Sequence, residues 1–536
     1  MRHIDTEVLV LGGGATGTGI IRDLAMRGFK AVLVERRDLA YGTTGRYNGI
    51  IHSGSRYAPR DIETARECIR ENHILRRIMP QCIEETGGFV VATPWDDPAF
   101  GDVLQRTSRE AGIPFEEYSV GQLLKAEPLL NPGISRCFWV PDVIADSFLA
   151  ARLNAQSALE YGADVLTYHE VTTLVKEGER VVGAVCRDVA NGEDVRISAD
   201  LVLNATAAWA GKVAATAGIT INILCGKGTM VAVNQRLLNV IITRCRQAAD
   251  CDAVAPSHSI SVLGSTDVRV DDPDCFGVDP REVHLIFSEG DKIVPGISRR
   301  RMLRSWAGVR PLFQADENEP LDDREVSRSH VILDHERRDG VGGMLTIVGG
   351  KWTTYRLMAE EMVDAACRKL GSPRECRTHL EPLPGIEGRK FHVRQSPLEQ
   401  VEQDAGYGEL VCECELVSRR RVEAAILEKD IRTVDDIRRD TRLGMGTCQG
   451  GFCIHRAVGL LHRLQKAANT SSGETTRDFL QERWKGMLPV LSGDQVRQQR
   501  LNELVAVDVL AVDLAPGEPL SHLKCDPYCP ATAKQS

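Results

Sequence analysis

The apolar residues near the N-terminus follow two patterns, a short continuous run and a helical repeat. Residues 6–11 (TEVLVL) predict a buried strand, and the apolar positions between Thr18 and Arg27 recur at helical spacing. Gly28 then ends the helix, and residues 31–34 (AVLV) predict a second buried strand. A strand, a helix and a strand in this order predict a parallel sheet with a right-handed crossover.

The same two patterns return later, separated by a long mixed region from about 216 to 330. We expect further helices over 62–79, 148–161, 353–370, 419–428 and 433–439, and further strands over 89–93, 200–206 and 343–348. The fold class expected is therefore α/β, with a Rossmann-like nucleotide domain that carries an inserted α+β substrate domain. These two domains together are expected over 1–377. The nucleotide domain takes about 1–85, 140–215 and 330–377, and the substrate domain takes about 86–139 and 216–329. A linker at 378–408, a small Cys-bearing domain at 409–466 and a tail at 467–536 are expected to follow.

Composition and charge exclude some classes of protein. The 536 residues are 43% hydrophobic and 26% charged, as in ordinary globular proteins. Aromatic residues are 5% and the net charge is −9, which argues against a nucleic-acid partner. We find no signal-peptide pattern and no apolar run long enough to span a bilayer, so we expect a cytoplasmic protein. In a reducing compartment most of the 16 cysteines should be buried thiols, except those at metal-ligand spacing.

The turn after the first strand carries a glycine pattern that predicts a dinucleotide site. Gly12, Gly14 and Gly17 form G-x-G-x-x-G between a strand and a helix. The glycines allow the tight turn, the approach of backbone N–H groups to a pyrophosphate and close helix–strand packing. The helix N-terminus adds partial positive charge, and Glu35 ends the next strand where a carboxylate can bind ribose hydroxyls.

The glycine pattern alone does not separate FAD from NAD. Residues 36–57 (RRDLAYGTTGRYNGIIHSGSRY) form a loop rich in Gly, Thr and Ser, which can wrap a second phosphate and run under a flavin ring. No second G-x-G-x-x-G follows to hold a separate nicotinamide. These features together favour FAD.

Several segments resemble the FAD-dependent glycerol-3-phosphate dehydrogenases, which belong to the D-amino-acid-oxidase-like flavoproteins. They are GGGATGTG (12–19), ERRDLAYGTTGR (35–46), HSGSRY (52–57), AGVRPL (307–312) and GGKWTTYR (349–356). A C-terminal Cys module and FLQERWKG (479–486) make the chain more similar to the large catalytic subunits of the anaerobic enzymes of this family. The resemblance covers almost the whole chain and keeps the order of the motifs.

The resemblance implies a site for a phosphorylated substrate beside the flavin. The family's substrate ligands match Arg56, Tyr57, Arg310, Arg328, Lys351 and Thr353. Fixed cations suit a dianionic phosphate ester, although a lone arginine is more often a solvated surface charge. The run Arg299–Arg301 is interpreted as such a solvated face and is left out.

The resemblance also implies residue roles in catalysis and in flavin binding. His52 is the candidate general base, with a role in orienting the flavin or capping a turn as an equal alternative, and Arg310 would polarise the substrate oxygen. Thr43 and Thr44 would bind the pyrophosphate, and the matching family loops place Ala205 and Thr206 at the adenosine side and Gly349 and Gly350 at the flavin.

Four cysteines near the C-terminus have metal-ligand spacing. Cys412 and Cys414 form C-x-C, and Cys448 and Cys453 form C-x-x-x-x-C among glycines. Four thiolates on two short loops could hold a [2Fe–2S] cluster or a zinc ion, or they could remain unligated. The arrangement resembles the bacterioferritin-associated ferredoxin-like [2Fe–2S] module, which favours the cluster. Two further cysteines, Cys525 and Cys529, are more simply explained as thiols of the tail.

The function implied is oxidation of sn-glycerol 3-phosphate to dihydroxyacetone phosphate. Electrons would leave the flavin through the [2Fe–2S] cluster to partner flavin and iron–sulfur subunits, and from them to menaquinone. The chain would then associate with the inner face of the membrane through those partners. The alternatives are a dehydrogenase of another small hydroxy acid or amino acid on the same fold, and a non-catalytic electron-transfer subunit.

Overall fold

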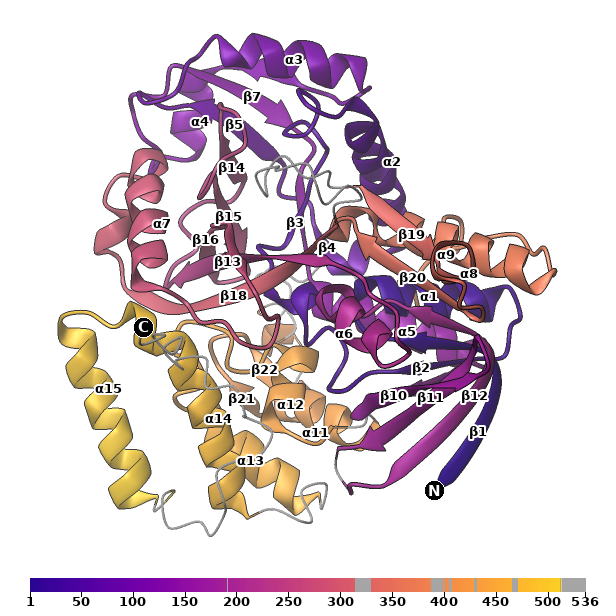
Figure 1. Cartoon of the computed structure of the whole chain (residues 1–536). Coiled ribbons are helices and arrows are strands. Elements are labelled where there is room, and N and C mark those ends of the chain that lie inside the picture. The colour runs from indigo at the N-terminus through magenta and orange to yellow at the C-terminus, as the bar shows by residue number, and fades with distance from the viewer. Residues whose placement is uncertain are drawn as a thin grey trace, which may run out of the picture.

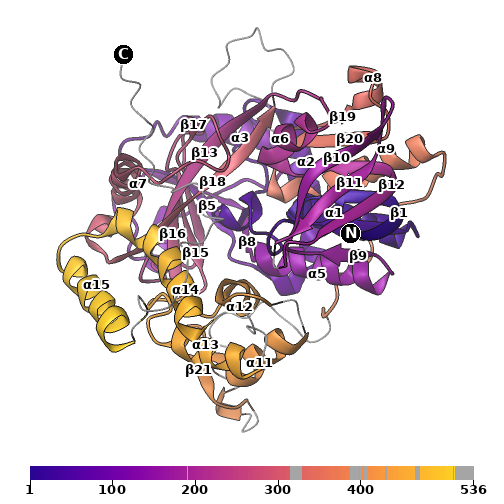
Figure 2. The same ribbon diagram turned by 60° about the horizontal axis from the view of Figure 1, so that its bottom comes forward.

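The computed structural model describes residues 1–189, 191–313, 329–386, 398, 401–403, 407–428, 431–464, 471–510 and 512. Figure 1 shows two large α/β regions built mainly from the first 370 residues, and a smaller, mostly helical module that packs against both. In Figure 2 the C-terminal helices lie together on one side of the molecule.

The first region is a mixed sheet with a parallel centre, in the order β10-β11-β12-β1-β2-β9, with β20 beside β12 and β19 beside β20. The central pairs β12–β1, β1–β2, β2–β9 and β12–β20 are parallel, whereas β10, β11 and β19 join in antiparallel fashion. The strands are β1 (Arg2–Leu11), β2 (Ala31–Val34), β9 (Asp164–Leu166), β10 (His169–Glu177), β11 (Arg180–Asp188), β12 (Asp194–Asn204), β19 (His330–Asp334) and β20 (Met344–Gly349).

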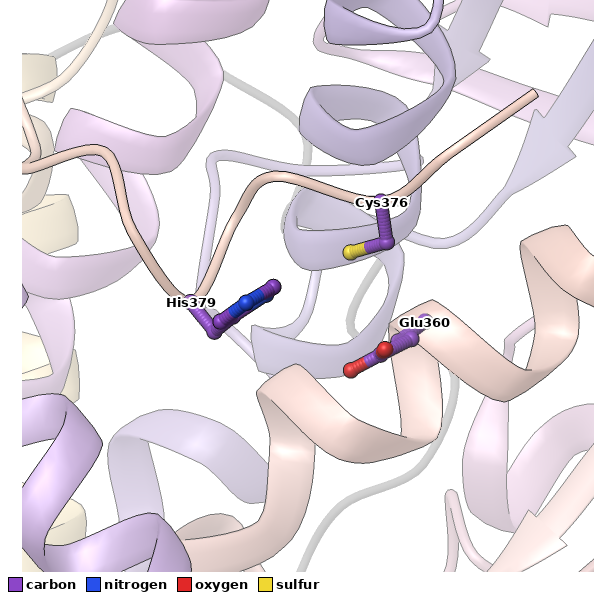
Figure 3. Close-up of side chains that lie close together, drawn as sticks. All are labelled: Glu360, Cys376 and His379. Atoms are coloured by element: carbon purple, nitrogen blue, oxygen red, sulfur yellow. The ribbon is translucent and has the colours of Figure 1, made fainter.

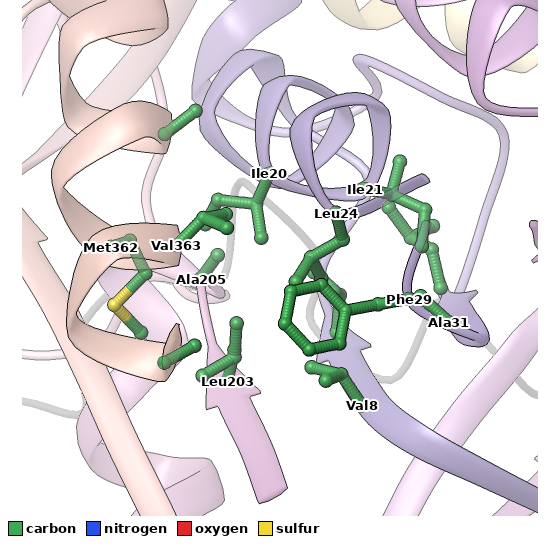
Figure 4. Close-up of a cluster of buried hydrophobic side chains, with 14 of the residues drawn as sticks. Val8, Ile20, Ile21, Leu24, Phe29, Ala31, Leu203, Ala205, Met362 and Val363 are labelled. Carbon is green, nitrogen blue, oxygen red and sulfur yellow. The ribbon is translucent and has the colours of Figure 1, made fainter. Parts of the chain in front are cut away.

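Helices cover this sheet because parallel strands are apolar on both faces. On one face, α1 (Ala15–Met26), α5 (Ser147–Glu160) and α9 (Tyr355–Leu370) pack on the sheet. Figure 4 shows the core between them, where Ile20 of α1 lies beside Val363 of α9, and Leu24 lies beside Phe29 above Val8. The other face is covered by α6 (Ala210–Ala215) and neighbouring segments.

The second region is a sheet in the order β17-β13-β16-β15-β14-β5-β7-β6, with β18 beside β13. Its strands come from two separate stretches of chain, 88–140 and 223–313, so the long insertion and an earlier segment build one sheet. They are β5 (Gly88–Ala92), β6 (Glu116–Tyr118), β7 (Arg136–Val140), β13 (Ile223–Val233), β14 (Ile241–Arg244), β15 (Ala253–Ser257), β16 (Ile260–Gly264), β17 (Val268–Val270) and β18 (Met302–Phe313). Five helices lie around the two sheets: α2 (Ile62–Ile78), α3 (Phe100–Glu110), α4 (Val120–Ala126), α7 (Pro280–Ile293) and α8 (His335–Asp339). A small third sheet is formed by β3 (Ile50–Ile51), β4 (Ile83–Glu84) and β8 (Val143–Ala145).

The Cys module has its own hydrophobic core. It contains the hairpin β21 (Leu410–Cys412) and β22 (Val417–Ser418) and the helices α11 (Arg419–Glu428), α12 (Val434–Thr441) and α13 (Cys453–Arg463). Residues assigned by sequence to the tail form α14 (Ser472–Met487) and α15 (Asp494–Leu504). The Phe479 side chain of α14 is buried in the module core, so this part of the tail completes the module.

The elements expected from periodicity match the structure within a few residues, except that several strands begin earlier. The strand expected at 200–206 is the end of β12, and the strand expected at 6–11 is the end of β1. Within the described residues, no helix is both long enough and apolar enough to cross a membrane.

Candidate functional site

The glycine turn after β1 has no room for side chains. Gly12 has a φ of +101°, and a Cβ there would lie 2.9 Å from the carbonyl oxygen of Ala205. A Cβ on Gly17 would lie 1.8 Å from the carbonyl oxygen of Gly12. The N-cap of α1 is Gly14, which provides no side-chain cap. The helix N-terminus is therefore built to present backbone N–H groups to an anion, as a bound pyrophosphate requires.

Glu35 faces this turn, as the sequence predicts. Its Oε2 accepts a hydrogen bond from the N–H of Gly13 at 2.7 Å, and its Oε1 accepts one from the N–H of Arg37 at 2.9 Å. Burial raises the pKa of this carboxyl, while the two N–H donors oppose the rise. Each oxygen keeps a lone pair for a ribose hydroxyl. The residues present thus fit the adenosine half of FAD.

The other flavin-binding residues predicted from the sequence lie on either side of the glycine turn. Thr44 Oγ1 accepts from the N–H of Ala15 at 2.9 Å, which places this hydroxyl at the N-terminus of α1. The Thr43 hydroxyl instead donates to the Val309 carbonyl at 2.7 Å and links loop 36–57 to β18. Ala205 follows β12 directly beside Gly12, and the Thr206 hydroxyl donates to Asn204 at 2.6 Å.

His52 forms a pair with a carboxylate that the sequence analysis missed. His52 Nδ1 lies 3.1 Å from Oδ2 of Asp142, whose Oδ1 accepts from the N–H of Ser53 at 2.6 Å. Asp142 is buried, which by itself would raise its pKa, but the hydrogen bonds from His52 and Ser53 outweigh burial and lower it. An ionised carboxylate on Nδ1 holds the proton there and leaves Nε2 as the basic nitrogen.

Three further predicted residues lie around His52. The His52 N–H donates to Thr353 Oγ1 at 3.3 Å, and the His52 ring meets Tyr57 edge-on with 6.1 Å between ring centres. The Lys351 ammonium lies 5.3 Å from the centre of the Tyr57 ring. Lys351 and Thr353 follow the left-handed glycines Gly349 and Gly350, so the turn after β20 carries both residues to loop 36–57.

A small cavity of about 20 Å³ lies beside His52 and is lined by charged residues. Arg56, Arg244 and Arg246 contribute positive charge there, and Asp142 and Asp252 contribute negative charge. Arg56 Nη2 is 3.8 Å from Asp252 Oδ2. Burial raises the pKa of Asp252, and the two nearest guanidiniums oppose the rise.

Arg310 lies on β18, where neighbouring groups fix the position of its guanidinium. Nη1 donates to Asp267 Oδ1 at 2.9 Å, and Nη2 donates to Ser265 Oγ at 2.6 Å and to the Thr266 carbonyl at 3.0 Å. A Cβ on Gly228 would lie 2.4 Å from Nη2, so a side chain on this neighbouring strand would displace the guanidinium. The remaining predicted substrate ligand, Arg328, lies outside the described residues.

The four predicted cysteine ligands come together in the C-terminal module. The Cys453 sulfur contacts those of Cys412 and Cys448, and the Cys448 sulfur contacts that of Cys414. Contact with Cys453 and backbone N–H groups of adjacent glycines lower the pKa of Cys448 to about 5. The pKa of Cys412 is lowered to about 7 by contact with Cys453 and by nearby backbone N–H groups. Such N–H donors stabilise thiolate ligands.

Four cysteine sulfurs in mutual contact are the ligand set that a [2Fe–2S] cluster or a single zinc ion requires.

The module is bound to the nucleotide domain through polar side chains, many of them on α12. The Tyr168 hydroxyl donates to both carboxylate oxygens of buried Asp436, at 2.6 and 2.7 Å. The guanidinium of Arg439 lies 5.5 Å from the ring centre of Tyr41, and its Nε donates to Asp38 Oδ2 at 2.9 Å. The module therefore packs against loop 36–57.

Two family models match the chain. The FAD dependent oxidoreductase family matches residues 7–356, and the BFD-like [2Fe-2S] binding domain matches residues 410–463. Both predicted cofactor-binding domains, for FAD and for a [2Fe–2S] cluster, are confirmed by these matches.

Curated relatives and solved structures agree with the two matches. A subunit of the anaerobic glycerol-3-phosphate dehydrogenase of Escherichia coli K12 is 40% identical, over 93% of this chain and 96% of its own length. The corresponding subunit of the Haemophilus influenzae enzyme is 37% identical, over 96% and 94%. The glycerol-3-phosphate dehydrogenase of Bacillus halodurans in complex with FAD has the same fold, with a TM-score of 0.68 over 91% of this chain and 96% of that one at 20% identity.

Proposed function

Because the chain belongs to the FAD dependent oxidoreductase family, with subunits of anaerobic glycerol-3-phosphate dehydrogenases among its relatives, we propose that it oxidises sn-glycerol 3-phosphate to dihydroxyacetone phosphate. The observation that carries the proposal is the grouping of Arg56, Lys351, Tyr57 and Thr353 around the His52–Asp142 pair. A pair able to take a proton thus lies beside cations able to bind a phosphate.

The residues divide between binding and proton transfer. Arg56 and Lys351 bind the substrate phosphate, and Arg310 polarises the oxygen at C2. His52 Nε2 takes the proton of the C2 hydroxyl, and Asp142 stabilises the imidazolium that forms. When bound, FAD supplies the acceptor for the hydride from C2, and the [2Fe–2S] cluster supplies single-electron transfer.

The relatives are named as single subunits of a dehydrogenase, which supports a place for this chain in a complex of several subunits. A [2Fe–2S] cluster held by the four cysteines would supply electrons to a partner iron–sulfur protein, and another partner would hold the complex at the inner face of the membrane, where menaquinone is the acceptor. Isolation of the chain with its partners in membrane fractions tests this arrangement. Recovery of the chain alone, from cells that contain the partner proteins, would count against it.

The test of the activity is an anaerobic absorbance spectrum before and after addition of glycerol 3-phosphate. We expect the flavin band to bleach in the wild-type protein. The Cys448→Ser variant serves as the matched control, because its flavin should still bleach while its iron content falls. A flavin band that glycerol 3-phosphate leaves unchanged, but that another hydroxy acid or an amino acid bleaches, would refute the substrate assignment.

A further inference from the structure

A second group of metal-ligating side chains precedes the four cysteines in the sequence and lies between α9 and the segment that follows it. The Glu360 carboxylate, the Cys376 sulfur and a ring nitrogen of His379 all lie within 4.8 Å of one another. Figure 3 shows the sulfur of Cys376 and the carboxylate of Glu360 on the side that faces the His379 ring. Thiolate, imidazole and carboxylate are the three ligand types that zinc uses.

We propose that Glu360, Cys376 and His379 bind a zinc ion that joins α9 to the segment 371–386. No part of the proposed oxidation requires this ion. The three ligands are an open set, with a water molecule as the fourth ligand.

His379 provides an observation that points independently to a ligand. Its Nδ1 is buried and has no hydrogen-bond partner among the residues that the structure describes. A buried ring nitrogen without a partner is costly, because it has lost its hydrogen bond to water. A metal ion on the imidazole removes that cost. The His379 carbonyl accepts from Arg77 Nη2 at 2.7 Å, which fixes the backbone of this residue.

Neighbouring residues hold the other two ligands in place. Arg356 Nη1 donates to Glu360 Oε2 at 2.6 Å and leaves the other carboxylate oxygen for a metal ion. The same nitrogen donates to Thr378 Oγ1 at 3.2 Å, and Thr378 Oγ1 lies 3.2 Å from the Cys376 sulfur. One guanidinium thus orients both ligands from outside, as residues behind a metal site commonly do.

Ion pairs surround the group. Arg27 pairs with Asp23 and Asp364, and Arg356 pairs with Glu71 and Glu360. Arg27 Nη1 also donates to the Arg374 carbonyl at 2.7 Å, so these contacts tie α9 to the segment that carries Cys376 and His379.

The test is the zinc content of the full-length holoprotein after equilibration in a zinc buffer, with iron and FAD measured in the same sample. We expect one zinc per chain beyond the iron of the cluster. Loss of an outer-shell partner alone weakens metal binding by about 10–100-fold. Cys376→Ser and His379→Ala each remove a ligand, so they should weaken zinc binding by more than this and leave iron and FAD unchanged.

Cys367→Ser is the matched control, because Cys367 is buried like Cys376 but lies on α9 and is outside the group. It should retain zinc. A wild-type protein with full iron and FAD that holds no more zinc than Cys376→Ser would overturn the proposal. If the serine variant fails to fold, the wild-type protein is loaded with cobalt and its difference spectrum is recorded. A cobalt–thiolate absorption band that His379→Ala abolishes supports the site. A wild-type spectrum without this band refutes it.

Discussion

Replacement of Asp142 by asparagine should separate proton transfer from substrate binding. In the structure, Asp142 accepts from the Ser53 N–H with one oxygen and faces His52 Nδ1 with the other. An asparagine that keeps the bond to Ser53 turns its NH₂ group toward Nδ1. Nδ1 must then accept a hydrogen bond, so the ring proton moves to Nε2 and the basic nitrogen is lost.

The size of the effect follows from the role proposed for His52. A positioned general base contributes about 10²–10⁴-fold to a rate, or about 2.7–5.4 kcal/mol of the barrier. We expect the rate constant of flavin reduction by glycerol 3-phosphate, measured anaerobically by stopped-flow absorbance, to fall by about this factor. The apparent substrate affinity should change little, because the phosphate contacts are untouched.

A double-mutant cycle with His52→Ala provides the control. If Asp142 acts through His52, the double variant should be no slower than His52→Ala alone. Flavin reduction in Asp142→Asn within about threefold of the wild-type rate, at full FAD content, would refute the base assignment. Equal slowing by Asp142→Asn in the presence and absence of the His52 ring would show that the carboxylate acts by another route.

Three further predictions follow from single contacts. Gly17→Ala should purify without FAD, seen as loss of the flavin band, because its Cβ would lie 1.8 Å from the Gly12 carbonyl oxygen; normal FAD content would contradict this. Tyr168→Phe should lower the free energy of unfolding, measured by urea denaturation, by about 1.5–3 kcal/mol, since buried Asp436 loses a hydroxyl donor. A decrease below about 0.5 kcal/mol would contradict this prediction. Asp274 is half buried, which raises its pKa, but lysine, arginine and tryptophan donors outweigh burial and lower the pKa to about 2. Its stabilising effect is therefore present above about pH 4 and is lost as the pH falls toward 2, so the melting temperatures of wild type and Asp274→Asn should converge over that range and not above it.

Much of the fold could be predicted from the sequence because its signals are local. The spacing of Gly12, Gly14 and Gly17 reflects steric limits within one turn, and the helical periodicity of 353–370 reflects the face that α9 buries. The family matches confirm the FAD domain and the [2Fe–2S] domain. The individual substrate and catalytic residues remain predictions that the experiments above test.

The partners of the site residues depend on contacts between distant parts of the chain. Asp142 lies 90 positions from His52, and no periodicity or motif links an aspartate before β8 to a histidine after β3. The sequence analysis also assigned 472–487 to the tail that follows the Cys module. Only the packed module shows that Phe479 of this helix completes a core formed by residues 411–461.

The order of elements, the glycine turn and the two pairs of cysteines could be predicted from sequence, since each depends on residues a few positions apart. The folded chain sets which carboxylate orients His52, how the two cysteine pairs meet, and that Cys376 and His379 lie beside Glu360. Those juxtapositions are set by how the sheets and helices pack, and packing joins residues whose separation in sequence carries no signal.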